Sequence, residues 1–373
     1  MGARWRWVLG GAALALVLAL IAWTAQRWVR GHAKGPPLID AAEPRIGAPL
    51  PPLDGATAWI DTRPLDAKRL TGRVTLLQFW SGADLPSTRV VSVAMAWAGR
   101  YAPLGVRVIF VHVPRFTFAQ DSAFVARDAR RLGIDAPIVV DSEQRVWGRY
   151  GVLPLPALVM ADHHGVVRYA RGGPRGLFQA EQALRGLLAD ASPGRALPLP
   201  ILRSPDDEPG GFGDATPRVA LVPGGAEGAL QSAQAGQAHV FAPALRAQVE
   251  STDGVPAPVG EWFVSGEGLR SVRGTAADYL ALRYHGRDVY AVISAPPGPP
   301  VRVWVLRDER WLPSAEAGAD VRAGGNGASS LAVSEPRMYH VVHGADGESH
   351  VLKLQPDRPG VEIYELCFDG SKP

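Results

Sequence analysis

Cysteine is almost absent from this chain, since Cys367 is the only one among 373 residues. An intramolecular disulfide is therefore excluded, and so is any chemistry that needs two thiols in one chain. Because Cys367 lies in an apolar run that resembles a terminal strand, we expect a buried and inert thiol there. Apolar residues make up 47% and charged residues 20% of the sequence, a balance typical of a folded protein.

Acidic side chains are missing from the first 34 residues, which carry five basic ones. The remainder holds 34 basic and 36 acidic side chains, so the pI near 9.1 owes much to the N-terminus. This distribution does not indicate a basic surface for nucleic acid, and no nucleic-acid partner is expected.

Charge of either sign is absent from residues 7–26. A helix of that length spans about 30 Å, the thickness of the hydrocarbon layer. We therefore predict a membrane helix over residues 7–29 behind a cytoplasmic tail, 1–6. A cleaved signal peptide is the alternative, but Trp23 stands where its cleavage site would need a small residue.

The rest of the chain divides by composition and periodicity. Residues 30–58 are rich in Pro, Gly and Ala and are predicted to be a linker. Residues 59–190 alternate apolar strands with helical stretches, which predicts an α/β domain whose sheet is covered on both faces. The strands are expected at 74–80, 106–113, 138–140, 157–161 and 166–170, and the helices at 87–101, 119–132 and 177–188.

Residues 191–258 are predicted to be a linker followed by a weakly patterned segment. Residues 259–373 carry short alternating runs between turns, which predicts an all-β sandwich. Its strands are expected at 279–284, 289–293, 301–306, 330–333, 338–342, 350–354 and 361–368.

The strand and helix around residue 84 carry the most specific motif. The sequence Phe-Trp-Ser-Gly-Ala-Asp-Leu-Pro-Ser over 79–87 resembles the active-site element of TlpA/ResA-like thioredoxins, which reads F-W-A-x-W-C-x-x-C. Downstream, Tyr-Gly-Val at 150–152 and the proline at 156 match further motifs of that family. The resemblance implies a thioredoxin fold with a cis peptide bond before Pro156, and it places Asp84 and Ser87 where the two cysteines belong.

This resemblance also bears on chemistry. Asp84 cannot act as the attacking thiolate, so we interpret it as the N-cap of the following helix. Ser87 has no evident base to activate it. No catalytic residue is therefore assigned, and an enzymatic role is not expected, although it is not excluded. The candidate binding surface for a protein or peptide consists of Trp80, Ala83, Asp84, Ser87, Leu155 and Pro156.

Residues 259–370 resemble the β-sandwich that follows the thioredoxin domain in DipZ-type proteins of cytochrome c biogenesis, through Gly260-Glu261-Trp262, Tyr284-His285-Gly286, 337–342 and 359–364. A jelly-roll-like sandwich of this kind is similar to carbohydrate-binding modules. Trp304 and Trp311 are thus candidates for a glycan platform, with core or inter-domain packing as the alternative.

Histidines offer weaker candidates for a site. His163 and His164 are expected in a hairpin turn, where a metal site lacks further ligands. A metal site at His340, His343 and His350 is an alternative, but three histidines on predicted strands without a carboxylate motif favour surface or hydrogen-bonding roles. No metal or cofactor is therefore expected.

The combined prediction is a single-pass protein of the inner membrane with its large C-terminal part periplasmic. We expect a non-catalytic protein-binding or assembly factor of the bacterial envelope. The alternatives are a TlpA-like thiol:disulfide oxidoreductase linked to cytochrome c maturation or redox homeostasis, and a module that binds glycans or the cell wall.

Overall fold

The computed structural model describes residues 46–151, 153–208, 213–225, 228–243, 252–344 and 348–370. The predicted tail, the predicted membrane helix at 7–29 and most of the 30–58 linker lie outside these residues. Among the described residues, no helix has both the length and the apolar character needed to cross a membrane.

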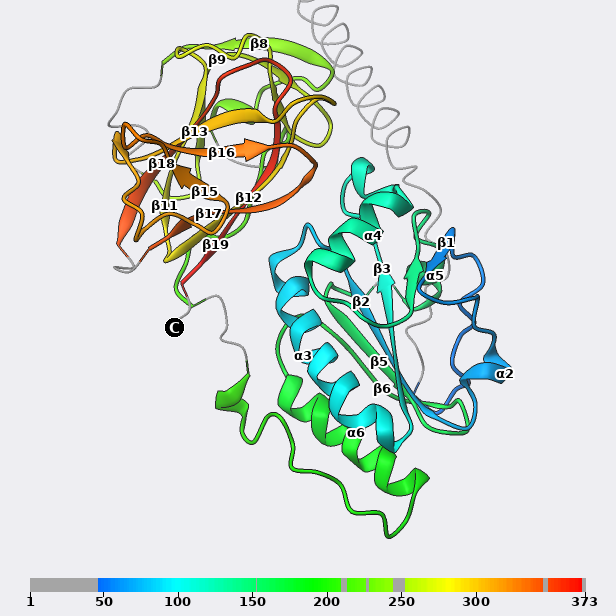
Figure 1. Ribbon diagram of the computed structural model, residues 1–373. Helices are drawn as coiled ribbons and strands as arrows, with labels where there is room; N and C mark the ends of the chain where they lie inside the picture. Colours follow the sequence, from blue (N-terminus) through cyan, green and yellow to red (C-terminus); the bar gives the residue numbers. More distant parts are fainter. Residues whose placement is uncertain are drawn as a thin grey trace, which may run out of the picture. The chain divides into compact units, whose positions relative to one another are not determined.

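A six-stranded sheet forms the centre of the α/β domain, with strand order β1-β4-β3-β2-β5-β6 (Figure 1). Strand β2 pairs in parallel with β3 and antiparallel with β5. The strands are β1 (Ala58–Ile60), β2 (Val74–Trp80), β3 (Val106–His112), β4 (Ile138–Val140), β5 (Ala157–Ala161) and β6 (Val167–Gly172). All five predicted strands are confirmed, and β1 was not predicted.

The helices cover both faces of this sheet, as the apolar strands predict. Alternate residues of β2 point into two separate cores, Leu76 and Trp80 into one and Leu77 and Phe79 into the other. The first core also receives α3, α4 and α6, whereas the second receives α5 and the segment that contains Leu53. The helices are α2 (Ala67–Leu70), α3 (Leu85–Tyr101), α4 (Ser122–Arg131), α5 (Arg145–Arg149) and α6 (Leu177–Ala191).

One predicted helix begins later than expected, and a short helix was not predicted. The helix expected at 119–132 begins later, because Asp121 accepts a hydrogen bond from the N–H of Ala123 and so caps α4. Residues Thr117–Gln120 before it form a 3₁₀ turn. The short helix α5 was not predicted, since five residues are too few to show a helical period.

The stretch after α6 was expected to be a linker, yet part of it packs on the α/β domain. The buried carboxylate of Glu181 accepts hydrogen bonds from the backbone N–H groups of Ile201 and Leu202, both at 2.7 Å. Leu202 itself is buried in the core that α3 and α6 share. Residues 201–202 are therefore held by the helix that precedes them.

The C-terminal part is all β, and its strands form two halves joined by β9 (Pro256–Val264) (Figure 1). One end of β9 pairs with β11, and the other end pairs with β8 and β10. Valines 301, 303 and 305 point into the single core of this part, as their alternation predicts. All seven predicted strands are confirmed.

The described strands of this part outnumber the predicted ones. Ten strands pair in the order β15-β16-β13-β18-β11-β9-β10-β19-β12-β17. Three further strands pair beside this path: β14 with β13, β7 with β19 and β8 with β9. The strands are β7 (Val219–Ala220), β8 (Gln237–Phe241), β10 (Leu269–Ser271), β11 (Tyr279–His285), β12 (Asp288–Ser294), β13 (Val301–Arg307), β14 (Arg310–Trp311), β15 (Val321–Ala323), β16 (Ser329–Val333), β17 (Arg337–His343), β18 (Ser349–Pro356) and β19 (Glu362–Asp369). Residues 219–241, which carry little sequence pattern, thus contribute β7 and β8.

Candidate functional site

The first turn of α3 is built around Asp84. Its backbone is extended, with φ −128° and ψ 108°, and its carboxylate accepts the Ser87 N–H at 3.0 Å. The Ser87 hydroxyl donates to the same oxygen at 2.7 Å. Both residues are buried. The predicted N-cap is confirmed, and the two positions assigned to cysteines by resemblance are bonded to each other.

Gly82 leaves room for a second carboxylate below this turn. A Cβ atom at position 82 would lie 1.3 Å from Oδ2 of Asp128, a distance that no side chain tolerates. Asp128 is buried on α4, and its Oδ1 accepts from Nε of Arg131 at 3.1 Å. The glycine of the motif is thus required by packing at this point.

Two arginines neutralise the buried acids above the turn. Arg115 binds Glu365 of β19 through two contacts, Nη1 to Oε1 at 2.9 Å and Nη2 to Oε2 at 2.7 Å. The same Nη1 donates to the carbonyl of Ala83 at 3.1 Å and lies 3.5 Å from Asp84. Arg218 lies 3.6 Å from Asp84 and 3.4 Å from Glu365. A four-member ion cluster therefore joins the start of α3 to β19.

Burial determines the protonation of the acidic groups here. Desolvation raises the pKa of Asp84, and the hydrogen bonds from Ser87 and the charge of Arg115 only partly offset it. Burial would lower the pKa of Arg115, but the contacts with Glu365 keep it raised. Burial also raises the pKa of Cys367 well above its usual range, and the adjacent Glu365 adds to this effect. The only thiol is therefore held protonated.

Apolar side chains of β12, β17 and β19 cover the start of α3. Ala83 and Leu85 share a buried cluster with Val292, Met338 and Cys367. Tyr364 belongs to the same cluster, and its ring packs 5.0 Å from that of Phe116 and 5.1 Å from that of Phe118. Of the predicted binding residues, Ala83 is thus covered by the chain's own C-terminal part, and Asp84 faces Arg218 of that part.

The remaining predicted site residues lie at the same end of the sheet, where β2 ends and β5 begins. Trp80 is fully buried, and its ring meets His112 edge to face at 5.1 Å. The Leu155–Pro156 peptide bond is cis, as the resemblance implies. Pro156 is buried and its carbonyl accepts from Gly173, whereas Leu155 is half-buried against the second core.

A groove opens beside the covered turn. It encloses about 230 Å³ and is lined by Leu85, Pro86, Ala215, Thr216, Pro217, Arg218, Cys367 and Phe368. Most of these groups are apolar. Pro86 is the second residue of α3, so the groove adjoins the positions of Asp84 and Ser87.

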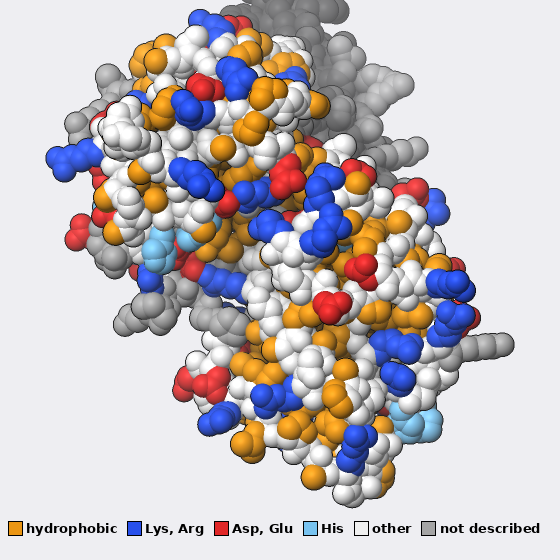
Figure 2. All heavy atoms as spheres, in the orientation of Figure 1, with side chains coloured by type: hydrophobic (Ala, Val, Ile, Leu, Met, Phe, Trp, Pro, Cys, Tyr) orange, Lys and Arg blue, Asp and Glu red, His pale blue; other side chains and the backbone are white. Residues whose placement is uncertain are grey.

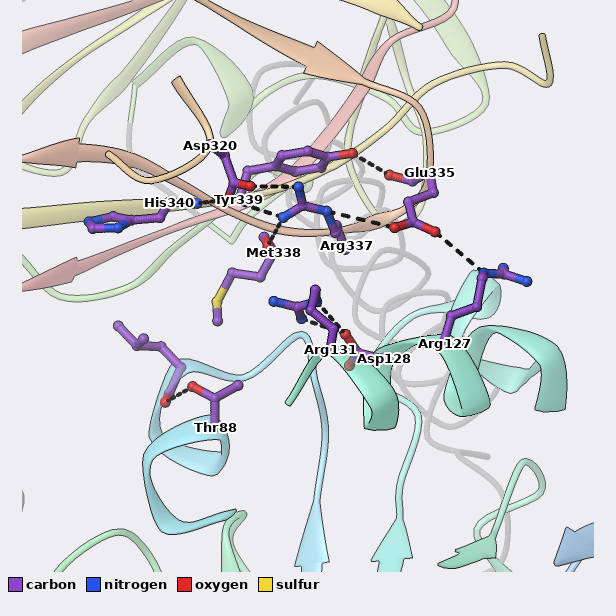
Figure 3. A network of polar contacts seen from close by, with 11 residues as sticks. Thr88, Arg127, Asp128, Arg131, Asp320, Glu335, Arg337, Met338, Tyr339 and His340 are labelled. Atoms are coloured by element: carbon purple, nitrogen blue, oxygen red, sulfur yellow. Dashed lines mark hydrogen bonds and ion pairs between the residues drawn. The ribbon is translucent and has the colours of Figure 1, made fainter. Parts of the chain in front are cut away.

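A second polar network lies between α4 and β17 (Figure 3). Nε of Arg127 is 3.4 Å from Glu335, and both side chains are largely exposed. Arg337 donates to Asp320 at 2.6 and 3.1 Å, and its guanidinium lies over the ring of Tyr339. On the face drawn in Figure 2, basic and acidic side chains lie interspersed.

The sequence reasoning did not find Arg115, Arg218 or Glu365. One signal was present, because Glu365 interrupts the otherwise apolar run at 363–368, and an acid in such a run needs a partner when it is buried. Nothing in the sequence identifies that partner, since Arg115 lies 250 positions away.

The histidine predictions have mixed outcomes. His163 and His164 lie in the turn between β5 and β6, as expected, where the Asp162 carboxylate accepts from the N–H groups of His164 and Val166. His340 and His343 do have a carboxylate partner, Asp288 of β12, which the sequence reasoning missed. His350 is not part of that group and contacts Asp308.

Trp304 and Trp311 lie next to each other, with ring centroids 5.6 Å apart. The valines beside Trp304 point inward, so its ring lies on the outer face of β13, where Arg302 packs over it. Trp311 is 43% exposed.

Three comparisons place this architecture among known proteins. Residues 231–369 match a family described as "Thioredoxin like C-terminal domain". The chain is 29% identical to Protein DipZ of Mycobacterium bovis over 333 residues, which cover 85% of this chain and 42% of that protein. It is also 29% identical to the thiol-disulfide oxidoreductase ResA of Halalkalibacterium halodurans over 139 residues, 36% of this chain and 71% of that protein.

Solved structures were also compared. A putative thiol:disulfide interchange protein DsbE from Chlorobium tepidum aligns with 39% of this chain and 98% of its own, at 18% identity and a TM-score of 0.34. The chain spans well under half the length of the DipZ proteins that it matches. In sequence, the chain is thus similar to DipZ over most of its length and to the thiol-disulfide oxidoreductase ResA over 139 residues, and its all-β part matches the thioredoxin-like C-terminal domain family.

Proposed function

We propose that this chain is a non-catalytic thioredoxin-like protein that binds or assembles other proteins in the bacterial envelope. One observation carries the proposal. The positions at which its relatives would hold two cysteines contain Asp84 and Ser87, which are buried and bonded to each other, while the adjacent Ala83 and Leu85 pack against β19.

The chemistry of disulfide exchange supports a non-catalytic role. Exchange starts with an accessible thiolate and is completed by a second thiol. Cys367 is buried and its raised pKa keeps it protonated, so it offers neither a nucleophile nor a partner. An aspartate at the helix start keeps a negative charge near the helix dipole but cannot attack sulfur.

The proposed partner is an extended segment of another protein. It would place an apolar side chain in the groove beside Pro86, where Pro217 and Arg218 form the exposed lip. The exposed charge of Arg218 favours an acidic residue next to that apolar side chain, in addition to the two acids that it already faces. The proposed contact with the partner therefore lies on the surface beside the first turn of α3, not on the covered turn itself.

The proposed location is the inner membrane, with residues 7–29 as a single anchor and the large C-terminal part on the periplasmic side. The uncharged run at 7–26 and the two flanking groups of basic residues support an anchor. A reporter fused near residue 45 that is active only outside the cytoplasm would test the orientation.

Insulin reduction with dithiothreitol tests the absence of catalysis. We expect the native chain and Cys367→Ser to give the same rate as buffer. The double variant Asp84→Cys, Ser87→Cys is the matched comparison, because it supplies the missing dithiol in the same fold. Turnover by the native chain that survives Cys367→Ser would refute the proposal.

Binding is tested by quantitative co-purification from membranes with Pro217→Arg, which places a long charged side chain at the lip of the groove. Pro193→Arg is the control, since it is an equally exposed proline outside the groove. Loss of a hot-spot contact predicts a fall of about tenfold or more in recovery of a specific partner. Equal recovery with both variants would exclude the groove.

Carbohydrate binding is a second candidate function, favoured by the Trp304–Trp311 pair and the exposure of Trp311. Sugar rings pack on exposed aromatic faces. Retention of the full chain on purified cell-wall polysaccharide should be lost with Trp311→Ala and kept with Arg310→Ala, its exposed neighbour. Equal retention of both variants, or none by the native chain, would remove this candidate.

A further inference from the structure

Two histidines of β17 point to the same side of the sheet because the strand is irregular. His340 and His343 are three residues apart, and in a regular strand such residues face opposite sides. The register between β12 and β17 shifts between Val289 and Tyr290, so that Val289 pairs with Val342 but Tyr290 pairs with His340. A bulge of this kind redirects a side chain, and here it brings both imidazoles to one face.

Asp288, the first residue of β12, completes the group. It pairs directly with His343 across the two strands. Its Oδ1 lies 2.9 Å from Nε2 of His340 and 2.6 Å from Nδ1 of His343. One ligand atom from each residue lies within 4.8 Å of the others. Three groups that bind transition metals therefore converge from two neighbouring strands.

The exposure of the three side chains suits a site that an ion can enter. The side chain of Asp288 is 12% exposed and that of His340 is 21% exposed, whereas that of His343 is 49% exposed. The imidazole of His340 is held in place by the ring of Tyr290, which stacks on it at 4.5 Å with an interplanar angle of 15°. Two ligands are thus positioned by packing, and the third lies at the open side.

Groups next to His340 and Asp288 would affect the free energy of metal binding. Nδ1 of His340 accepts a long hydrogen bond of 3.3 Å from the N–H of Ala319. A metal on Nε2 would put the ring proton on Nδ1, so this contact would have to open. The charge of Asp288 also acts on Arg89 of α3, which forms an ion pair with Asp369.

We propose that Asp288, His340 and His343 bind one Zn²⁺ ion on the outer face of the all-β part. Two imidazoles and one carboxylate are the ligand set that Zn²⁺ uses when it keeps a further position for water. The ion would tie the end of β17 to β12. β17 is the last strand on the path of paired strands, and its other edge is bonded to the short segment 316–320, through a bridge between Ala317 and Val342 and neighbouring backbone hydrogen bonds. A metal would add a further link between β17 and β12 at this end of the strand.

The test is calorimetric titration of the full, untagged and metal-free chain with ZnCl₂. We expect one ion per chain, with affinity lowered by more than about tenfold in His343→Ala and in Asp288→Asn. His350→Ala is the matched control, because His350 also bonds an aspartate, Asp308 at 2.6 Å, but lacks a second histidine. Its affinity for zinc should equal that of the native chain.

Thermal unfolding gives an independent measurement. Zn²⁺ that binds only the folded chain raises Tm, and saturation at about 100 times Kd adds about 2.7 kcal/mol to the free energy of unfolding. The rise should appear in the native chain and in His350→Ala but not in His343→Ala. The absence of one-to-one binding by the native chain, or equal binding by all variants, would overturn the proposal and leave a hydrogen-bonded His–Asp–His group.

Discussion

Arg115 and Glu365 form a paired, two-contact ion bridge between the loop after β3 and the last strand, with N–O distances of 2.9 and 2.7 Å. The carboxylate is almost fully buried, whereas 19% of the arginine side chain is exposed. Removal of one partner from such a pair leaves an uncompensated charge. This bridge therefore ties the α/β part to the last strand, as does the similarly buried pair of Arg89 and Asp369.

Arg115→Met should lower the free energy of unfolding by about 3 kcal/mol, because Glu365 would lose its bidentate partner. The loss stays near the lower end of the usual range since Arg218 remains 3.4 Å from Glu365. The double variant with Glu365→Met should recover most of it. Urea unfolding measures both.

The control for this pair is Arg127→Ala. Arg127 pairs with Glu335, and both side chains are 40% or more exposed (Figure 3). Exposed pairs contribute about 0–1 kcal/mol, so the variant should unfold almost like the native chain. Equal losses from Arg115→Met and Arg127→Ala would contradict the argument from burial.

Asp84→Ala should destabilise the chain by about 1–2 kcal/mol, because the helix loses its cap and Ser87 loses the partner of its hydroxyl. Asp84→Asn should cost less. The amide keeps an acceptor oxygen, and burial already raises the pKa of Asp84 and so disfavours the charged form. Thermal unfolding measures the stability of the two variants. A larger loss of stability in Asp84→Asn than in Asp84→Ala would contradict this prediction.

The buried His112 should make the free energy of unfolding depend on pH. Burial lowers its pKa from 6.5 to about 3, so the folded chain holds it neutral while the unfolded chain protonates it below pH 6.5. The unfolded state then binds more protons, and the free energy of unfolding falls by up to about 1.4 kcal/mol per unit as the pH drops from 6.5 towards 3.

His112→Phe should flatten that slope. Urea unfolding at several pH values between 6.5 and 4 compares the two proteins, so contributions from other groups cancel in the difference. Parallel curves for the native chain and the variant would show that His112 does not titrate as its burial requires.

Gly82→Ala should lower the free energy of unfolding by about 1–3 kcal/mol, because its Cβ would overlap the buried carboxylate of Asp128. Gly99→Ala is the matched control within α3, where an added Cβ meets no atom within 4 Å. It should stabilise the helix by about 0.5–1 kcal/mol. Thermal unfolding should therefore shift in opposite directions for the two variants.

The sequence predicts those strands and helices whose own residues show a clear periodic or capping pattern. The run at 74–80 is mostly apolar, which predicts a strand covered on both faces, and it is buried throughout. Asp84 directly precedes the first residue of α3, where a capping side chain is expected. Strand β8 escaped prediction because its residues are largely exposed and its place depends on pairing with β9.

The rest of the candidate site depends on contacts distant in sequence. Asp288 lies 52 positions before His340, and the bulge that aligns His340 with His343 breaks the two-residue period on which strand predictions rest. No spacing rule could have joined these three residues before the strand order was known.

The lone thiol of Cys367 is a built-in probe of the contact between β19 and α3. It is buried where β19 covers the first turn of α3, although it also borders the groove beside Pro86, so a thiol-specific dye should label it slowly unless that cover lifts. The labelling rate would then report how often the two surfaces part, without any engineered probe.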